Sequence, residues 1–154
     1  MQLREEAEYL QLALAMGLID PGAVIDWADN MIAAVDNPPI QVIDVSLAAS
    51  RPATDIMDLL QAVPGDGDPA AAALRVLALF LQRFRAGRVS LERAVDMLWA
   101  YSNWAAVPED ERLQAANFTD ALFCAQQGYY GTPNSVRAAV EAFLVEHAAG
   151  EAPA

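Results

Sequence analysis

The single histidine and the single cysteine are the side chains in this sequence best suited to nucleophilic or metal chemistry. His147 continues the apolar stripe of a predicted final helix, which indicates a position at the edge of the core, and the end of a helix favours its partial positive charge. Cys124 falls where a small buried thiol is typical. One histidine and one cysteine cannot form a usual transition-metal cluster, and no nucleophile pairs with the histidine. We therefore expect no catalytic residue, no metal and no cofactor.

Carboxylates are the plentiful reactive groups, with 21 Asp and Glu residues in the chain. Asp66 and Asp68 resemble a fragment of a calcium loop, but the later ligands of that loop are missing, so we read them as a turn residue and a helix cap. Gly65 and Gly67 are not followed by a lysine, which excludes a phosphate-binding loop of the usual kind. An enzyme that uses only carboxylates remains an alternative interpretation.

Charge is distributed unevenly along the chain, which has a net charge of −12 and no lysine. Residues 1–68 carry −10, residues 69–106 carry +3 and residues 107–154 carry −5. Such an acidic chain is not expected to bind nucleic acid or an anionic membrane. Its acidic half either attracts a basic partner or only keeps the protein soluble, and the sequence leaves both readings open.

Two groups of residues are candidates for partner binding. The first is a set of aspartates on predicted exposed helix faces and in the connections between them: Asp26, Asp29, Asp36, Asp44, Asp55 and Asp58. The second belongs to a late cluster of aromatic residues, most of them expected in the core: Trp99, Tyr101, Trp104, Phe118, Phe123, Tyr129 and Tyr130. Of these, Trp104, Tyr129 and Tyr130 fall near helix ends, where exposed aromatics mark interfaces.

These residues are positioned by helices, because capping residues and prolines punctuate the chain. Four pairs place a capping side chain before a proline: Asp20-Pro21, Asn37-Pro38, Asp68-Pro69 and Thr132-Pro133. Ser90 begins another helix, and Gly17, Gly87, Gly128 and Gly150 stand at expected helix ends. The predicted helices are residues 2–16, 21–35, 39–50, 53–63, 69–86, 91–104, 108–127 and 133–148. Residues 40–47 are rich in β-branched side chains, so a short strand is the alternative there.

The fold class that follows is all-α, a compact multi-helix bundle of about eight helices built from stacked helical hairpins. Residues 69–86 are apolar almost all round, as in the buried central helix of a bundle. Residues 1–148 are expected to form a single domain and residues 149–154 a disordered tail. Gly17-Leu18-Ile19-Asp20 and Gly87-Arg88-Val89-Ser90 share a pattern, which is explained either by an internal repeat or by the general rules of helix–turn–helix connections.

The N-terminal residues are acidic where a secretory signal needs basic ones, and the longest apolar stretch, residues 70–81, is too short to span a bilayer. We therefore expect a cytoplasmic protein that is not embedded in a membrane.

The run Tyr9-Leu10, Gly17 to Asp20 and Val24 to Asp29 resembles the opening of small all-helical bacterial proteins of unknown function. Some of these accompany secreted toxins as immunity partners, and immunity proteins against nuclease toxins are often small, acidic and cytoplasmic. The resemblance implies a non-catalytic acidic binding protein and, more specifically, an immunity-type inhibitor of a basic toxin-like protein. A structural or regulatory helical adaptor is a further alternative, and the sequence does not indicate an oligomeric state.

Overall fold

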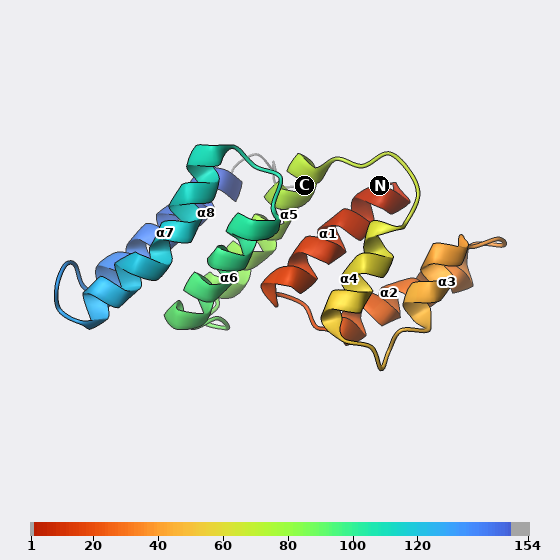
Figure 1. Ribbon diagram of the computed structural model, residues 1–154, viewed down its shortest axis with the longest axis horizontal. Helices are drawn as coiled ribbons and strands as arrows, with labels where there is room; N and C mark the ends of the chain where they lie inside the picture. The colour runs from red at the N-terminus through yellow and green to blue at the C-terminus, as the bar shows by residue number, and fades with distance from the viewer. Residues whose placement is uncertain (1, 149–154) are drawn as a thin grey trace. The chain divides into compact units, whose positions relative to one another are not determined.

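The computed structural model describes residues 2–148, and in this range the chain is all-α, as predicted (Figure 1). Eight helices are present among the described residues: α1 (Leu3–Met16), α2 (Pro21–Ala34), α3 (Ile40–Ser46), α4 (Ala53–Gln61), α5 (Pro69–Arg85), α6 (Leu91–Trp104), α7 (Glu109–Gln126) and α8 (Pro133–Ala148). The predicted disordered tail and the helix end at Gly150 lie outside the described residues. No described helix has the length and apolar character needed to cross a membrane.

Most of the predicted capping side chains begin their helices. The Asp20 carboxylate accepts a hydrogen bond of 2.9 Å from the backbone N–H of Ala23, and the Asp68 carboxylate accepts one of 3.0 Å from Ala71. The Ser90 hydroxyl does the same for Arg93 at 3.2 Å. Each cap satisfies a backbone donor that has no partner within its own helix.

The segment with the strand alternative is a helix, α3, and it is shorter than predicted. It begins after Pro39 and has no side-chain cap, so the prediction that Asn37 caps this helix is wrong. The two consecutive prolines explain the difference, because the ring of Pro39 disfavours the helical conformation at Pro38. Residues 47–50 form turns that lead to Pro52 and α4.

Glycine ends three of the described helices at the predicted positions. Gly17, Gly87 and Gly128 have φ values of 75°, 72° and 74°, in the left-handed region that a side chain disfavours. In each case the following residue donates a backbone hydrogen bond back to the last turn of the helix, Leu18 to Ala13, Arg88 to Arg83 and Tyr129 to Cys124.

The chain divides into two compact units, residues up to Ala72 and residues from Ala73 onward, with the boundary inside α5. In the first unit, α1 packs on α4, α4 on α3 and α3 on α2. Their buried side chains form one core, which includes Leu10, Val24, Val45, Ile56 and Leu60. Burial of each such aliphatic side chain contributes about 1.5–3 kcal/mol to stability.

Arg4 ties the beginning of α1 to the end of α4. Its Nη1 donates hydrogen bonds to the carbonyl oxygens of Leu60, Gln61 and Val63, at 3.1, 2.7 and 3.3 Å. Its Nε lies 3.2 Å from Oε1 of Glu8, and both side chains are largely buried. The arginine therefore satisfies carbonyl groups near the C-terminal end of α4, where the helix dipole favours a positive charge.

In the second unit, α6 packs on α7, α7 on α8 and α6 on α8. The apolar helix α5 buries Val76, Leu77, Phe80 and Phe84. α8 contacts the end of α5, because the Arg137 guanidinium stands 5.4 Å from the centre of the Phe84 ring and Arg85 pairs with Glu141 at 2.9 Å.

In both units the second helix packs on the third and the third on the fourth. The fourth helix contacts the first in both, in the second unit through side chains at the end of α5, and the second unit adds packing of α6 on α8. In both, the first helix ends at a left-handed glycine and the second begins at a capped residue three positions later. This correspondence fits the repeat interpretation and is also what up-and-down helical packing produces. The assignment of residues 1–148 to a single domain stays a prediction.

Candidate binding surface

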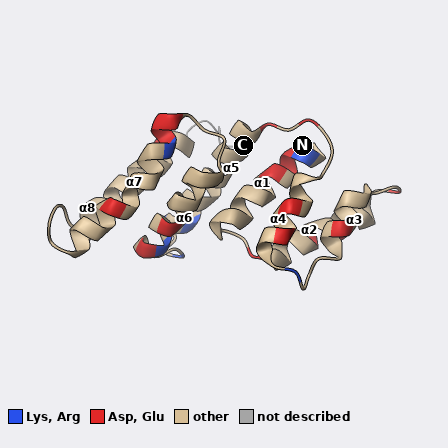
Figure 2. Ribbon diagram, viewed as in Figure 1, with Lys and Arg blue, Asp and Glu red and all other residues tan. Residues whose placement is uncertain are grey.

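The six aspartates predicted to bind a partner all belong to the first unit, and all are exposed. We call them the acidic surface: Asp26 and Asp29 on α2, Asp36 in the α2–α3 connection, Asp44 on α3, and Asp55 and Asp58 on α4. Figure 2 shows acidic residues along each of these three helices.

Helical spacing explains why these carboxylates point outward. On α2, Val24 and Ala28 are fully buried, so Asp26 and Asp29, three positions apart, share the opposite face. On α4, Ile56 and Leu60 face the core, which leaves Asp55 and Asp58 toward solvent. Each pair therefore occupies one exposed helix face, as the sequence predicted.

Contacts in the structure connect these faces through α3. The Ser46 hydroxyl of α3 donates a short hydrogen bond to the Asp29 carboxylate of α2. On the side of α4, an open hollow of about 350 Å³ is lined by Asp44, Leu47, Arg51 and Leu59. Asp55 precedes Leu59 by one helical turn, on the same face. The exposed carboxylates are therefore spread over α2, α3 and α4 and do not gather in one cluster.

The described residues do not neutralise this surface with ion pairs. None of the six aspartates makes an ion pair within residues 2–148. The first unit has two arginines for twelve acidic residues, and Arg4 is held against α4. Arg51 is exposed and lines the hollow beside Asp44. With one exposed arginine against six exposed aspartates, the surface presents a predominantly negative field to solvent.

The three aromatic residues predicted at an interface are exposed, at 54% for Trp104, 73% for Tyr129 and 84% for Tyr130. They do not form one patch. Trp104 ends α6 and the tyrosines follow α7, so the 18 residues of α7, about 27 Å of helix, separate them. Tyr129 instead packs edge-on to Phe123, with ring centres 6.5 Å apart.

The expectation of a buried position is wrong for two other aromatic residues and for the thiol. Trp99 and Phe123 are about half exposed. Cys124 is partly exposed. Their apolar character alone does not reveal this exposure.

A polar cluster inside the second unit was not predicted. The Tyr101 hydroxyl of α6 donates a 2.7 Å hydrogen bond to Oε1 of Glu111 on α7, and Nδ1 of His147 on α8 lies 3.4 Å from Oε2 of Glu111. The histidine ring also packs on Phe143, with centres 4.4 Å apart. His147 thus lies at the edge of the core, as predicted.

The chemistry of this cluster is that of a hydrogen-bond donor held neutral. Burial raises the pKa of Tyr101 far above its ordinary value, and the hydrogen bond to Glu111 and the negative charge of Glu111 raise that pKa further. A phenol in this state is a poor nucleophile and a good donor. The cluster therefore connects α6, α7 and α8 and stabilises their packing.

No three His, Cys, Asp or Glu side chains between residues 2 and 148 stand close enough together to hold a metal ion. Comparison of the chain with family models, with curated proteins and with solved structures finds no match. The acidic surface is therefore the feature of the molecule from which a function is inferred.

Proposed function

We propose that this protein is a non-catalytic binding protein whose acidic surface meets a basic partner protein. The observation that carries the proposal is the set of six exposed aspartates, none of which makes an ion pair within residues 2–148. Unpaired surface charge of one sign accelerates encounter with an oppositely charged protein and orients it.

The resemblance of residues 9–29 to small all-helical bacterial proteins of unknown function, some of which accompany toxins, extends this proposal. An immunity-type inhibitor acts by covering a basic toxin, a task that needs a stable acidic surface and no catalytic group. Asp26 and Asp29 lie within the resembling segment and on the acidic surface, so the two lines of argument meet on α2.

The test reverses charge on the acidic surface and compares it with an equal reversal elsewhere. The variant Asp26→Lys/Asp29→Lys changes α2, and the control Asp96→Lys/Asp120→Lys makes the same change in net charge at exposed positions of the second unit. A partner is first captured from cells of the native organism, and its association rate with each purified protein is then measured at several salt concentrations.

We expect the α2 variant to associate about tenfold more slowly at low salt, with the difference shrinking as salt rises, because screening acts beyond about 8 Å at physiological ionic strength. The control should associate at close to the wild-type rate. Equal rates for the α2 variant and the wild type, with no salt dependence, would show that these carboxylates serve only solubility. Circular dichroism of both variants checks that the helices are intact.

A further inference from the structure

A groove runs along the surface between α7 and α8 of the second unit. Its larger part, about 480 Å³, is lined by Asp110, Leu113, Gln114, Asn117, Phe118 and Ala121 of α7 and by Ala139 of α8. A smaller part, about 180 Å³, shares Phe118, Ala121 and Ala139 and continues to Tyr130 in the connection between the helices. The shared residues make the two parts one feature, which we call the α7–α8 groove.

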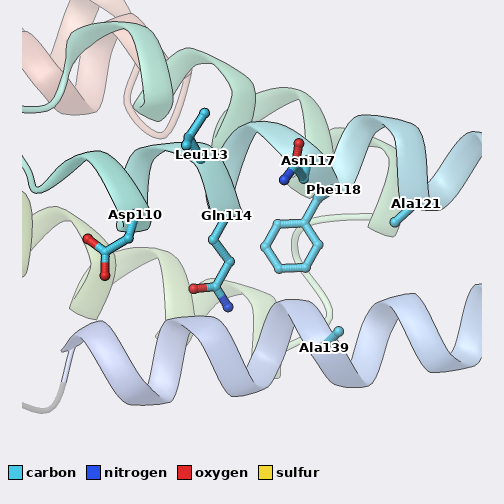
Figure 3. Close-up of a pocket in the computed structure, with 7 residues that line it drawn as sticks. All are labelled: Asp110, Leu113, Gln114, Asn117, Phe118, Ala121 and Ala139. Atoms are coloured by element: carbon cyan, nitrogen blue, oxygen red, sulfur yellow. The ribbon is translucent and has the colours of Figure 1, made fainter.

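The groove exists because small side chains meet where the two helices face each other. Figure 3 shows Gln114 and the ring of Phe118 pointing from α7 toward α8, and Ala139 is the residue of α8 that lines this part of the groove. The Phe118 ring forms the floor, fixed edge-on against Phe143 of α8 with ring centres 5.7 Å apart. The floor is therefore rigid and apolar.

Large apolar side chains stand at both ends of the groove. Leu113 is 52% exposed near the beginning of α7, and Tyr130 is exposed at the far end. From Asp110 to Ala121 the α7 wall runs for about 16 Å, the length of three turns of helix. A groove of this length with an apolar floor at Phe118, and with alanines that allow close approach, fits the apolar face of a third helix.

The negative charge of the groove lining and of the chain indicates the charge of the helix that the groove binds. Asp110 is the charged residue of the lining, it is exposed, and it makes no ion pair within the described part of the chain. A second copy of this chain would bring another net charge of −12 and no lysine, so repulsion disfavours it. Resting on the function proposed above, we infer that the α7–α8 groove binds an amphipathic helix of a basic partner protein. A Lys or Arg of that helix lies against Asp110, and its apolar residues lie over Phe118.

The inference is tested with three synthetic peptides of about 18 residues, a length at which helices begin to be stable in water. The first combines a leucine stripe at helical spacing with lysines on the other face. The second peptide has the same composition as the first in scrambled order. The third keeps the order of the first peptide and has glutamates in place of its lysines. Binding of each to the full chain is measured by fluorescence anisotropy.

Two variants fill the groove from opposite walls, Ala139→Trp on α8 and Asn117→Trp on α7. The matched control is Ala138→Trp, an exposed neighbour outside the groove lining. We expect the basic amphipathic peptide to bind the wild type and Ala138→Trp equally. It should bind at least one correctly folded groove variant about tenfold more weakly, a loss of about 1.4 kcal/mol. The scrambled and acidic peptides should also bind the wild type about tenfold more weakly.

Equal binding of the amphipathic and scrambled peptides, or unchanged binding by both groove variants, would overturn the inference. So would dimerisation of the wild type that Ala139→Trp abolishes, because a second copy would then occupy the groove. The groove variants leave the acidic surface intact. If the groove variants bind the peptide as the wild type does while charge reversal on α2 slows association with the partner, only the groove inference fails. If the groove variants bind the peptide more weakly while charge reversal on α2 leaves the association rate unchanged, only the proposed role of the acidic surface fails.

Discussion

Replacement of Tyr101 by phenylalanine isolates one buried hydrogen bond. The phenylalanine ring keeps the volume and the edge-on contact with Phe143, at 6.5 Å between centres, while the 2.7 Å bond to Glu111 is lost. A hydrogen bond to a charged group contributes about 1.5–3 kcal/mol. We therefore expect Tyr101→Phe to lower the free energy of unfolding by about 2 kcal/mol near pH 7.

The difference should shrink in alkali, and its sign follows from the raised pKa of Tyr101. Below the ordinary tyrosine pKa of about 10, the hydroxyl is protonated in both the folded and the unfolded chain, and its full contribution to the free energy of unfolding is present. Above it the unfolded chain releases this proton and the folded chain keeps it, so the wild type loses stability as pH rises toward the folded-state pKa. Near pH 11 this deprotonation lowers the free energy of unfolding of the wild type by about 1.4 kcal/mol. The wild type is then more stable than Tyr101→Phe by about 0.6 kcal/mol.

The measurement is urea unfolding followed by far-UV circular dichroism near pH 7 and near pH 11. Other groups titrate alike in both proteins and cancel in the difference. The control Tyr130→Phe removes a hydroxyl that is exposed, and its free energy of unfolding should match the wild type near pH 7. A Tyr101→Phe difference that is absent near pH 7, or that stays constant or grows toward pH 11, would refute the proposed role of the Glu111 contact.

Two further predictions concern the first unit. Asp20→Ala removes the 2.9 Å cap of α2 and should cost about 1 kcal/mol of unfolding free energy in urea, whereas Asp36→Ala, without a cap role, should cost little; equal costs would contradict the cap. Arg4→Met removes three carbonyl contacts and leaves the buried Glu8 carboxylate unpaired, so it should cost about 3 kcal/mol. Adding Glu8→Gln should restore part of that loss, and a double variant no more stable than Arg4→Met would argue against the pairing.

The positions of the helices were predictable because their signals are local. Asp20, Asp68 and Ser90 each act within three residues of their own position, and Gly17 and Gly87 act on the turn before them. The error at Asn37 arose where two local signals compete, a capping side chain and a second proline. The exposure of the aspartate pairs on α2 and α4 was predictable for the same reason, because helical spacing places them opposite the apolar residues of their own helix.

The remaining features depend on residues that are distant in sequence. Arg4 meets carbonyl groups 56 to 59 positions later, and Glu111 lies between side chains of two other helices. No periodicity marks such partners. The α7–α8 groove depends on which small residues face each other, and Ala121 and Ala139 are ordinary helix residues until the two helices are placed together.

The contact of Arg4 with the end of α4 brings the beginning of the first helix of the first unit beside the end of its fourth helix. A helical unit closed in this way resembles a ring, because the chain enters and leaves it at neighbouring points. Such modules tolerate circular permutation and insertion into other chains, since new connections between their ends are short. A circular permutant would have its new termini in the exposed α2–α3 connection at Asp36 and Asn37, and a short linker near Arg4 would join the end of α4 to the beginning of α1. The same geometry makes tandem duplication of the unit simple, since each added copy returns the chain close to where it began.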